Sequence, residues 1–202
     1  MKDLKQIMPK KLGFGCMRLP VANGNSEEID DVVFSRMIDR YMEQGFVYFD
    51  TAYPYHNQKS EEAVRRCLVE RYDRERFLLA DKMPVWLVQN TEDYSEIFER
   101  QLARCGVTYF DFYLLHAMNK TRVEETEKTG GFAFVQRMKT EGRIRHIGFS
   151  FHDTAEALEE ILKNHPEMEF VQLQINYYDW ESENVQSRKC YEVAKKYGVP
   201  VI

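Results

Sequence analysis

The stretch FVYFDTAYPY, Phe46 to Tyr55, is an apolar run that ends in a carboxylate and is followed by a tyrosine. Two later runs end in the same way: Lys82 follows Phe77 to Ala80, and His116 follows Phe110 to Leu115. The carboxyl ends of parallel strands meet on one face of an α/β fold. We therefore expect Asp50, Tyr55, Lys82 and His116 to share one rim.

The apolar runs recur along the chain at a spacing typical of strand and helix units. They begin near Phe46, Phe77, Phe110, Ile144, Phe170 and Val199. Intervals of roughly 25 to 35 residues fit one strand plus one helix. Together with Leu12–Gly15 as a first strand, they predict an α/β fold with about seven strands and six helices.

This alternation favours an incomplete (β/α)8 TIM barrel, a single domain over residues 1–202 that lacks the last strand and helices. A doubly wound open sheet is the alternative. Its dinucleotide fingerprint is absent, because Gly13-Phe14-Gly15 has neither the third glycine nor a following helix.

One helix can be predicted from its apolar spacing. Ile29, Val33, Met37 and Tyr41 recur at every fourth residue and are followed by Gly45, which favours a helix with these side chains on its buried face.

Composition excludes several classes of protein. The net charge of −5 and pI of about 5.6 argue against nucleic acid or an anionic membrane as partner. The chain has no run of eighteen apolar residues, and Met1 to Lys5 lack the apolar stretch of a signal peptide, so we expect a cytoplasmic protein. The four cysteines form no C-x-x-C pair, which argues against a zinc ribbon or an iron–sulfur cluster.

The residues of the expected rim suit carbonyl reduction. Hydride delivery to a carbonyl carbon builds negative charge on the oxygen, and a proton donor there lowers the barrier. Tyr55 is a sluggish acid unless a neighbouring cation stabilises its anion, and Lys82 is that cation. Asp50 would anchor the ammonium, and His116 would polarise the carbonyl.

A metal-dependent hydrolase is a second hypothesis, because His56, His116 and His152 with Asp50 offer imidazole and carboxylate ligands. The chain has no H-x-H or H-E-x-x-H spacing, and Lys82 would repel a cation. No metal site is therefore predicted.

The motifs carry a family resemblance. Phe49 to Tyr55 with Ser60-Glu61-Glu62, then Lys82, His116 and Ile147 to Ser150, resemble the signature of the aldo-keto reductases from Leu12 to the last residue. The resemblance implies a barrel that reduces aldehydes or ketones, with NADPH preferred over NADH and a small carbonyl compound as substrate.

The resemblance also implies cofactor and substrate residues. Ser150 and Gln172 match positions that hold the nicotinamide carboxamide, although Phe151 stands where the family often has asparagine. Asn176 is a further candidate at the rim. Trp86 is a candidate wall of the substrate pocket, with core packing or loop anchoring as its alternative role.

In this family the groups for the adenosine phosphate follow the seventh and eighth strands, so we expect a C-terminally truncated domain with an incomplete cofactor site. The sequences that begin at Tyr53 and Phe149 resemble those of the subgroup that often carries a ferredoxin-like C-terminal extension. A non-catalytic, redox-sensing module that binds the nicotinamide cofactor is the alternative function.

Overall fold

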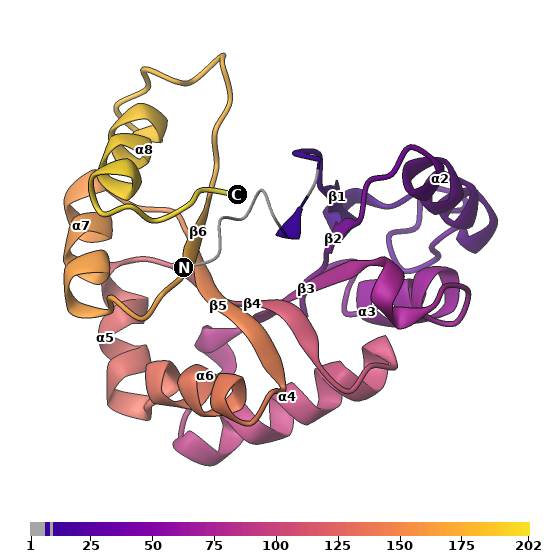
Figure 1. Cartoon of the computed structure of the whole chain (residues 1–202), viewed down its shortest axis with the longest axis horizontal. Coiled ribbons are helices and arrows are strands. Elements are labelled where there is room, and N and C mark those ends of the chain that lie inside the picture. Colours follow the sequence, from indigo (N-terminus) through magenta and orange to yellow (C-terminus); the bar gives the residue numbers. More distant parts are fainter. Residues whose placement is uncertain (1–6, 9) are drawn as a thin grey trace. The chain divides into compact units, whose positions relative to one another are not determined.

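The computed structural model describes residues 7–8 and 10–202. Met1 to Lys5, on which part of the location prediction rests, lie outside the described residues. The chain forms two compact units. Figure 1 shows its helices and strands in colours that follow the sequence. Unit 1 comprises Met1–Met83 and Ser95–Phe112, and unit 2 comprises Pro84–Tyr94 and Tyr113–Ile202.

Unit 1 holds the elements around the first three strands. In chain order they are β1 (Phe14–Gly15), α2 (Asp31–Glu43), β2 (Tyr48–Asp50), α3 (Ser60–Val64), β3 (Leu78–Met83), most of α4 (Thr91–Cys105) and the start of β4 (Phe110–Met118). Short 3-10 turns occur at Cys16–Arg18 and Arg74–Arg76, and a π-helical segment, Arg65–Val69, continues α3.

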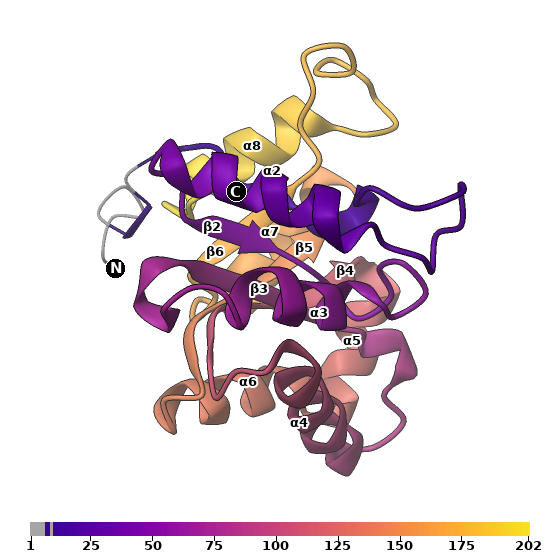
Figure 2. The ribbon, with the colours of Figure 1, turned by 90° about the vertical axis from the view of Figure 1, so that its right-hand side faces the viewer.

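The strands of unit 1 lie in the order β1-β2-β3-β4, and β2 pairs in parallel with both β1 and β3. Phe49 is the register partner of Phe14 and of Leu79, so three apolar side chains line up across the sheet. Phe49 and Leu79 are wholly buried. Figure 2 shows α2 and α3 in front of strands β2 and β3, which places them over one face of this sheet.

Helix α2 begins where a side chain caps it. The carboxylate of Asp30 accepts hydrogen bonds from the backbone N–H groups of Val32 and Val33, which would otherwise lack a partner. The predicted buried face is partly wrong. Tyr41 is buried, but Val33 and Met37 are exposed, and Phe34 and Ile38 take the core positions one residue further along. Val33 and Met37 instead line an open apolar groove beside β1.

Unit 2 holds the remaining elements. They are the start of α4, the end of β4, α5 (Lys120–Thr129), α6 (Gly131–Thr140), β5 (Ile144–Phe151), α7 (Ala155–Asn164), β6 (Phe170–Leu173) and α8 (Ser187–Lys196), with a 3-10 turn at Val85–Leu87. Its strands lie in the order β4-β5-β6, and β5 pairs with β6 in parallel.

The last predicted strand of the chain is present as a single bridge. Val201 pairs in parallel with Val171 of β6, and the backbone of residues 200–202 exchanges hydrogen bonds with β6. The strand predicted at Val199–Ile202 therefore continues the order of unit 2, although its regular pairing is limited to this bridge.

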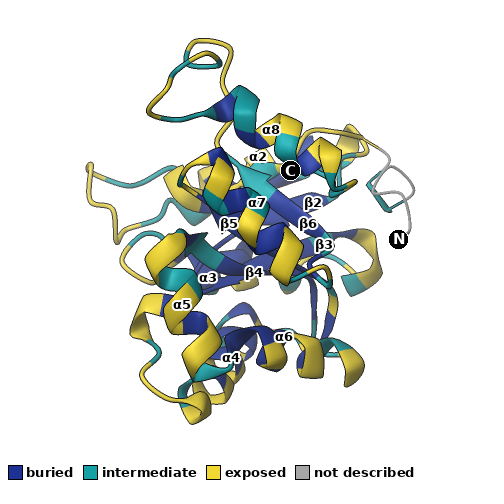
Figure 3. Ribbon diagram, turned by 90° about the vertical axis from the view of Figure 1, so that its left-hand side faces the viewer, coloured by how far each residue is buried: buried dark blue, intermediate teal, exposed yellow. Residues whose placement is uncertain are grey.

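A glycine is required where β5 meets β6. A Cβ atom on Gly148 would lie 2.5 Å from the carbonyl oxygen of Phe170, closer than real Cβ contacts. The Ile147-Gly148-Phe149-Ser150 motif thus allows close approach of the strands next to Ser150. Figure 3 shows most of β5 and the first half of β6 buried and the outer face of α7 exposed.

The predicted fold class is confirmed, with two differences. Within each unit the strand order follows the chain without the reversal that a doubly wound sheet requires, as in a (β/α)8 barrel. The described residues contain seven α-helices rather than six, because Gly130 at φ 83° divides the helical stretch before β5 into α5 and α6. Lys82 and His116 lie within β3 and β4 rather than beyond their ends.

Candidate active site

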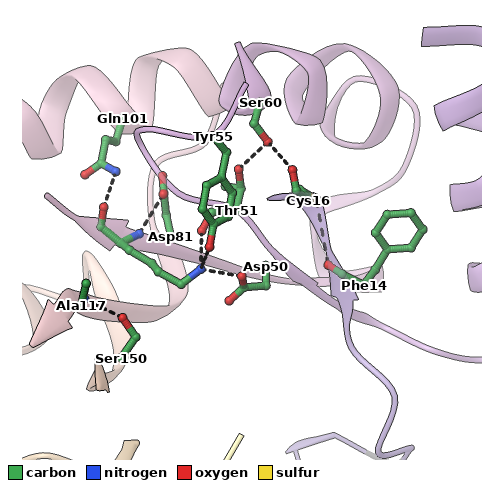
Figure 4. A network of polar contacts seen from close by, with 11 residues as sticks. Phe14, Cys16, Asp50, Thr51, Tyr55, Ser60, Asp81, Gln101, Ala117 and Ser150 are labelled. Atoms are coloured by element: carbon green, nitrogen blue, oxygen red, sulfur yellow. Dashed lines mark hydrogen bonds and ion pairs between the residues drawn. The ribbon is translucent and has the colours of Figure 1, made fainter. Parts of the chain in front are cut away.

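The ammonium group of Lys82 is the centre of the site in unit 1. Its Nζ atom lies 2.5 Å from Oδ1 of Asp50, 2.9 Å from the carbonyl oxygen of Thr51 and 3.1 Å from the hydroxyl of Tyr55. Figure 4 shows these three partners converging on one nitrogen. Lys82 is wholly buried and Asp50 is 8 % exposed. The three donors of the ammonium therefore each have a partner.

Strand register explains why Asp50 and Lys82 meet. Asp50 is the register partner of Ala80, so the two side chains leave the sheet on the same face. Side chains alternate along a strand, so Lys82 shares the face of Ala80 and reaches Asp50. Tyr55 is brought in by the turn after β2, where its backbone N–H donates to Ala52 at 3.1 Å.

The electrostatics keep both titrating groups protonated at neutral pH. Burial alone would lower the pKa of Lys82, but Asp50 and Tyr55 outweigh it, and the pKa lies above its ordinary value. Burial raises the pKa of Tyr55, while Lys82 acts in the opposite direction. The site thus combines a neutral phenol with a charged ammonium 3.1 Å from its oxygen.

The segment after Tyr55 has an uncommon backbone. His56, Asn57 and Gln58 have φ angles of 51°, 49° and 68°, in the left-handed region that costs non-glycine residues roughly 1 kcal/mol each. His56 secures the segment: Nε2 accepts from the N–H of Leu19 at 2.8 Å, and Nδ1 lies 2.8 Å from the carbonyl oxygen of Ser26. Because Nε2 accepts, the proton belongs on Nδ1.

These bonds bear on the metal hypothesis. Both ring nitrogens of His56 are occupied by backbone groups, so neither offers a lone pair to a cation. Over residues 7–8 and 10–202, no group of three His, Cys, Asp or Glu side chains is arranged to hold a metal ion.

Unit 2 holds the other predicted residues, and two of them are neighbours. Ser150 and Gln172 are register partners in β5 and β6, so their side chains lie side by side on one face. The Ser150 hydroxyl oxygen accepts from the N–H of Ala117 at 2.7 Å (Figure 4), so its hydrogen is directed to another acceptor. A hydroxyl and an amide side by side suit a primary carboxamide, which both donates and accepts.

His116 is in contact with Trp86. Their ring centroids are 5.2 Å apart, and Trp86 is 39 % exposed rather than a core residue. The guanidinium of Arg122 lies 5.0 Å from the Trp86 ring and donates to the carbonyl oxygen of Ala117 at 2.7 Å. Burial, and then Arg122, lower the pKa of His152. At 39 % exposure Trp86 is not a core residue, while its role as a pocket wall or a loop anchor stays a prediction.

Asn176 lies three residues beyond the end of β6 and is exposed. Its Oδ1 atom accepts from the N–H of Tyr178 at 2.9 Å, which is a local turn. The structure does not bring Asn176 into the Ser150–Gln172 pair.

Sequence reasoning missed three contributors: the carbonyl of Thr51, the backbone clamp by His56, and Arg122 beside Trp86. The first is a backbone carbonyl oxygen, which every residue type has, so the sequence gives no sign of its role. For the other two, only proximity to Tyr55 and to the end of β4 could have served as a signal.

In the described part of the chain, no helix is long and apolar enough to cross a bilayer.

Known proteins resemble this chain in sequence and in fold. Glyoxal reductase of Bacillus subtilis (strain 168) is 29 % identical over 153 residues, which are 75 % of this chain and 49 % of that protein. An aldo-keto reductase from Klebsiella pneumoniae in complex with NADPH has a TM-score of 0.68 at 21 % identity, over 94 % of this chain and 61 % of that one.

A putative aldo-keto reductase from Pseudomonas aeruginosa has a TM-score of 0.72 at 20 % identity, over 94 % of this chain and 70 % of that one. The solved relatives are (β/α)8 barrels, which this chain matches in part. The chain spans about half the length of the curated relative, at 49 %.

The model of the aldo/keto reductase family matches residues 11–202, nearly the whole chain. The strand order and the motif residues described above agree with this match. The chain belongs to the aldo/keto reductase family.

Proposed function

We propose that the protein reduces aldehydes or ketones to alcohols with NADPH, and that Tyr55 gives a proton to the carbonyl oxygen. The observation that carries this proposal is the Lys82 ammonium, which bonds Asp50 and the Tyr55 hydroxyl at the same time. Family membership and the likeness to a glyoxal reductase support the same reaction class.

The chain's own residues handle the proton. Negative charge grows on the carbonyl oxygen during reduction, and the neutral Tyr55 hydroxyl supplies the proton that cancels it. The Lys82 ammonium lies 3.1 Å from the oxygen that becomes a phenolate, and it stabilises that charge. Asp50 keeps the ammonium in place, so the charge balance of the buried group is preserved.

Ser150 and Gln172 are the residues that would hold the nicotinamide carboxamide, since one offers a hydroxyl and the other an amide on one face of the sheet. NADPH when bound supplies the hydride. The preference for NADPH over NADH and the single-domain organisation stay predictions, as does the role of Asn176.

His116 and Trp86 have proposed roles toward the substrate. His116 would polarise the carbonyl, and the exposed Trp86 ring in contact with it would form a wall of the substrate pocket. The guanidinium of Arg122 lies 5.0 Å from the same ring and would hold that ring in place.

The test is aldehyde reduction at saturating NADPH, followed by cofactor absorbance, with glyoxal and an uncharged monoaldehyde as substrates. Tyr55→Phe should lower kcat by about 10²- to 10⁴-fold, the usual contribution of a positioned acid, and leave NADPH affinity unchanged. Tyr53→Phe is the matched control, because it removes a hydroxyl from the same turn without touching Lys82, and it should keep the wild-type rate.

Other outcomes have distinct meanings. Fluorescence-detected NADPH binding without turnover in any variant would favour the non-catalytic, cofactor-binding module. A folded protein that binds no NADPH would contradict the proposal. Zinc or manganese found in the purified protein by elemental analysis would favour the hydrolase hypothesis.

A further inference from the structure

A closed ring of hydrogen bonds holds the backbone of Lys82 from the side opposite its ammonium. The Lys82 N–H donates to Oδ1 of Asp81 at 2.8 Å. The Gln101 amide donates to the Lys82 carbonyl oxygen at 3.0 Å (Figure 4) and also to Oε1 of Glu61 at 3.1 Å, a residue that the figure does not draw. The carboxyl groups of Glu61 and Asp81 lie within reach of a hydrogen bond to each other, which completes the ring. Glu61, Asp81, Lys82 and Gln101 are wholly buried.

The carboxyl groups in and around the ring outnumber the neighbouring cations by one. Arg104 pairs with Glu61 at 3.2 Å, and the Lys82 ammonium pairs with Asp50. Asp81 makes no ion pair with any of the described residues. Two carboxyl groups in contact in a dry interior cannot both be charged, because neither burial nor their mutual repulsion is compensated. One proton must therefore reside on the pair.

The groups that face Asp81 decide which carboxyl carries this proton. The titratable groups around it are Glu61 from α3, Cys105 from α4 at 3.7 Å, Cys16 from the first 3-10 turn, and Lys82 and Tyr55. Burial and then Glu61 raise the pKa of Asp81 well above its ordinary value. Burial also raises the pKa of Glu61, but Gln101 and Arg104 act against it. Gln101 and Arg104 both stabilise the charged form of Glu61, so Glu61 is the anion of the pair.

We propose that Asp81 is a neutral carboxylic acid that donates its proton to the Glu61 carboxylate, and that this pair positions Lys82. As an acid, Asp81 accepts the Lys82 N–H at one oxygen and donates from the other. Asp81 and Glu61 are thus positioning residues that act through Lys82. The positioning role rests on the proposed function of Lys82, whereas the protonation state of Asp81 is testable without any turnover.

The sign of the pH dependence follows from the proton. A carboxyl that takes up a proton on folding contributes full stability below its unfolded pKa and loses it as pH rises through the folded pKa. Asparagine keeps the shape and the hydrogen bonds of the neutral acid but needs no proton. Asp81→Asn should therefore gain stability over wild type with rising pH, about tenfold in the unfolding equilibrium constant per pH unit for one proton.

The experiment is urea unfolding of the whole chain between pH 5 and pH 9, pH values chosen to lie above the ordinary carboxyl range. Asp111→Asn is the matched control, since Asp111 is also wholly buried, on the neighbouring strand, but is paired with Arg74 at 2.6 Å. We expect Asp81→Asn to be at least as stable as wild type at pH 7 and Asp111→Asn to be less stable. Loss of stability or of folding in Asp81→Asn would overturn the proposal.

Glu61→Gln tells which carboxyl holds the proton. This change removes the anion that pairs with Arg104 and that accepts the Asp81 proton, so it should destabilise the chain strongly. If Glu61→Gln is tolerated while Asp81→Asn is not, the proton resides on Glu61, and the assignment to Asp81 is wrong.

The positioning role has its own readout, the NMR titration of a ¹³Cζ-labelled Tyr55. Asp81→Ala should raise the phenol pKa of Tyr55, because Lys82 moves from it, and Asp81→Asn should restore the wild-type titration. Gln101→Met, which removes both amide donors without opening a large cavity, should shift Tyr55 in the same direction and serves if Asp81→Ala does not fold. An unchanged Tyr55 titration in the folded variants would overturn the positioning role and leave the proposed function of Tyr55 intact.

Discussion

Asp81 and Lys82 are adjacent in β3 and project from opposite faces of that strand into opposite electrostatic surroundings. On one face, the Lys82 ammonium meets the Asp50 carboxylate at 2.5 Å, and a buried cation is matched by a buried anion. On the other face, Asp81 meets Glu61, and two acids are matched by one proton. The first arrangement depends on charge and the second on neutrality, although both groups are wholly buried or nearly so.

The comparison teaches that burial alone does not decide the state of a titratable group. Burial opposes the charged form of Lys82 as it does that of Asp81, yet the pKa of Lys82 lies above its ordinary value because Asp50 and Tyr55 are its neighbours. The partner supplied by the neighbouring element decides the outcome.

The largest effect should come from removing the charge on the first face. Lys82→Met leaves Asp50 as a buried carboxylate without its cation and should cost about 3 to 5 kcal/mol of unfolding free energy. Urea unfolding measures this loss. The double variant Asp50→Asn with Lys82→Met should recover much of it, and a double variant no more stable than Lys82→Met alone would contradict the ion pair.

A smaller effect should come from the segment that carries Tyr55. His56→Ala removes hydrogen bonds to Leu19 and Ser26 and should cost about 2 kcal/mol, with about 1 kcal/mol for each bond. The Tyr55 titration should change as well, whereas the pH dependence assigned to Asp81 should not. A changed Asp81 dependence would show that the two faces of β3 are coupled through this segment.

The pKa of Glu169, in unit 2, is shifted in the opposite direction from that of Asp81. Burial acts to raise its pKa, but His146, Lys139 and the N–H of Ile147 outweigh it and lower the pKa to about 2. Its stabilising effect is therefore present above the unfolded pKa and is lost as pH falls toward 2. Glu169→Gln should cost about 1 kcal/mol at pH 7 after solvent screening, and nothing at pH 2. Equal losses at both pH values in urea unfolding would refute this.

The smallest effect should come from an ion pair in water. Arg40 and Glu43 lie 3.5 Å apart, with side chains 74 % and 64 % exposed. Solvent screening removes most of their attraction, so Arg40→Ala should leave the urea midpoint unchanged. A loss as large as that of Lys82→Met would mean that burial is not what separates these pairs.

Much of the fold followed from local signals. The run Phe46 to Phe49 and its later counterparts located the strands, because parallel strands are apolar along their whole length. The convergence of Asp50, Tyr55 and Lys82 was also predictable, since strand alternation and register are short-range rules. The exposure of Val33 and Met37 was not predictable, because it depends on what lies beside β1 rather than on helical spacing.

The part of the site that sequence reasoning missed depends on distant partners. Asp81 resembles any carboxylate beside a lysine, and only Glu61 and Cys105, brought by α3 and α4, show it to be buried among acids. Arg122 is one of many arginines until its guanidinium is seen against Trp86. In both cases the residue type was visible in the sequence, but its neighbours were set by tertiary packing.

The most direct test of the account is the phenol titration of Tyr55, followed by ¹³Cζ NMR in wild type and in the Asp50→Asn, Lys82→Met double variant. Lys82 lowers the pKa of Tyr55 more than Asp50 raises it, so the pKa should be higher in the double variant, which lacks the ammonium. An identical titration in both proteins would show that Lys82 does not tune Tyr55, and it would contradict the proton-donor site on which the proposed function depends.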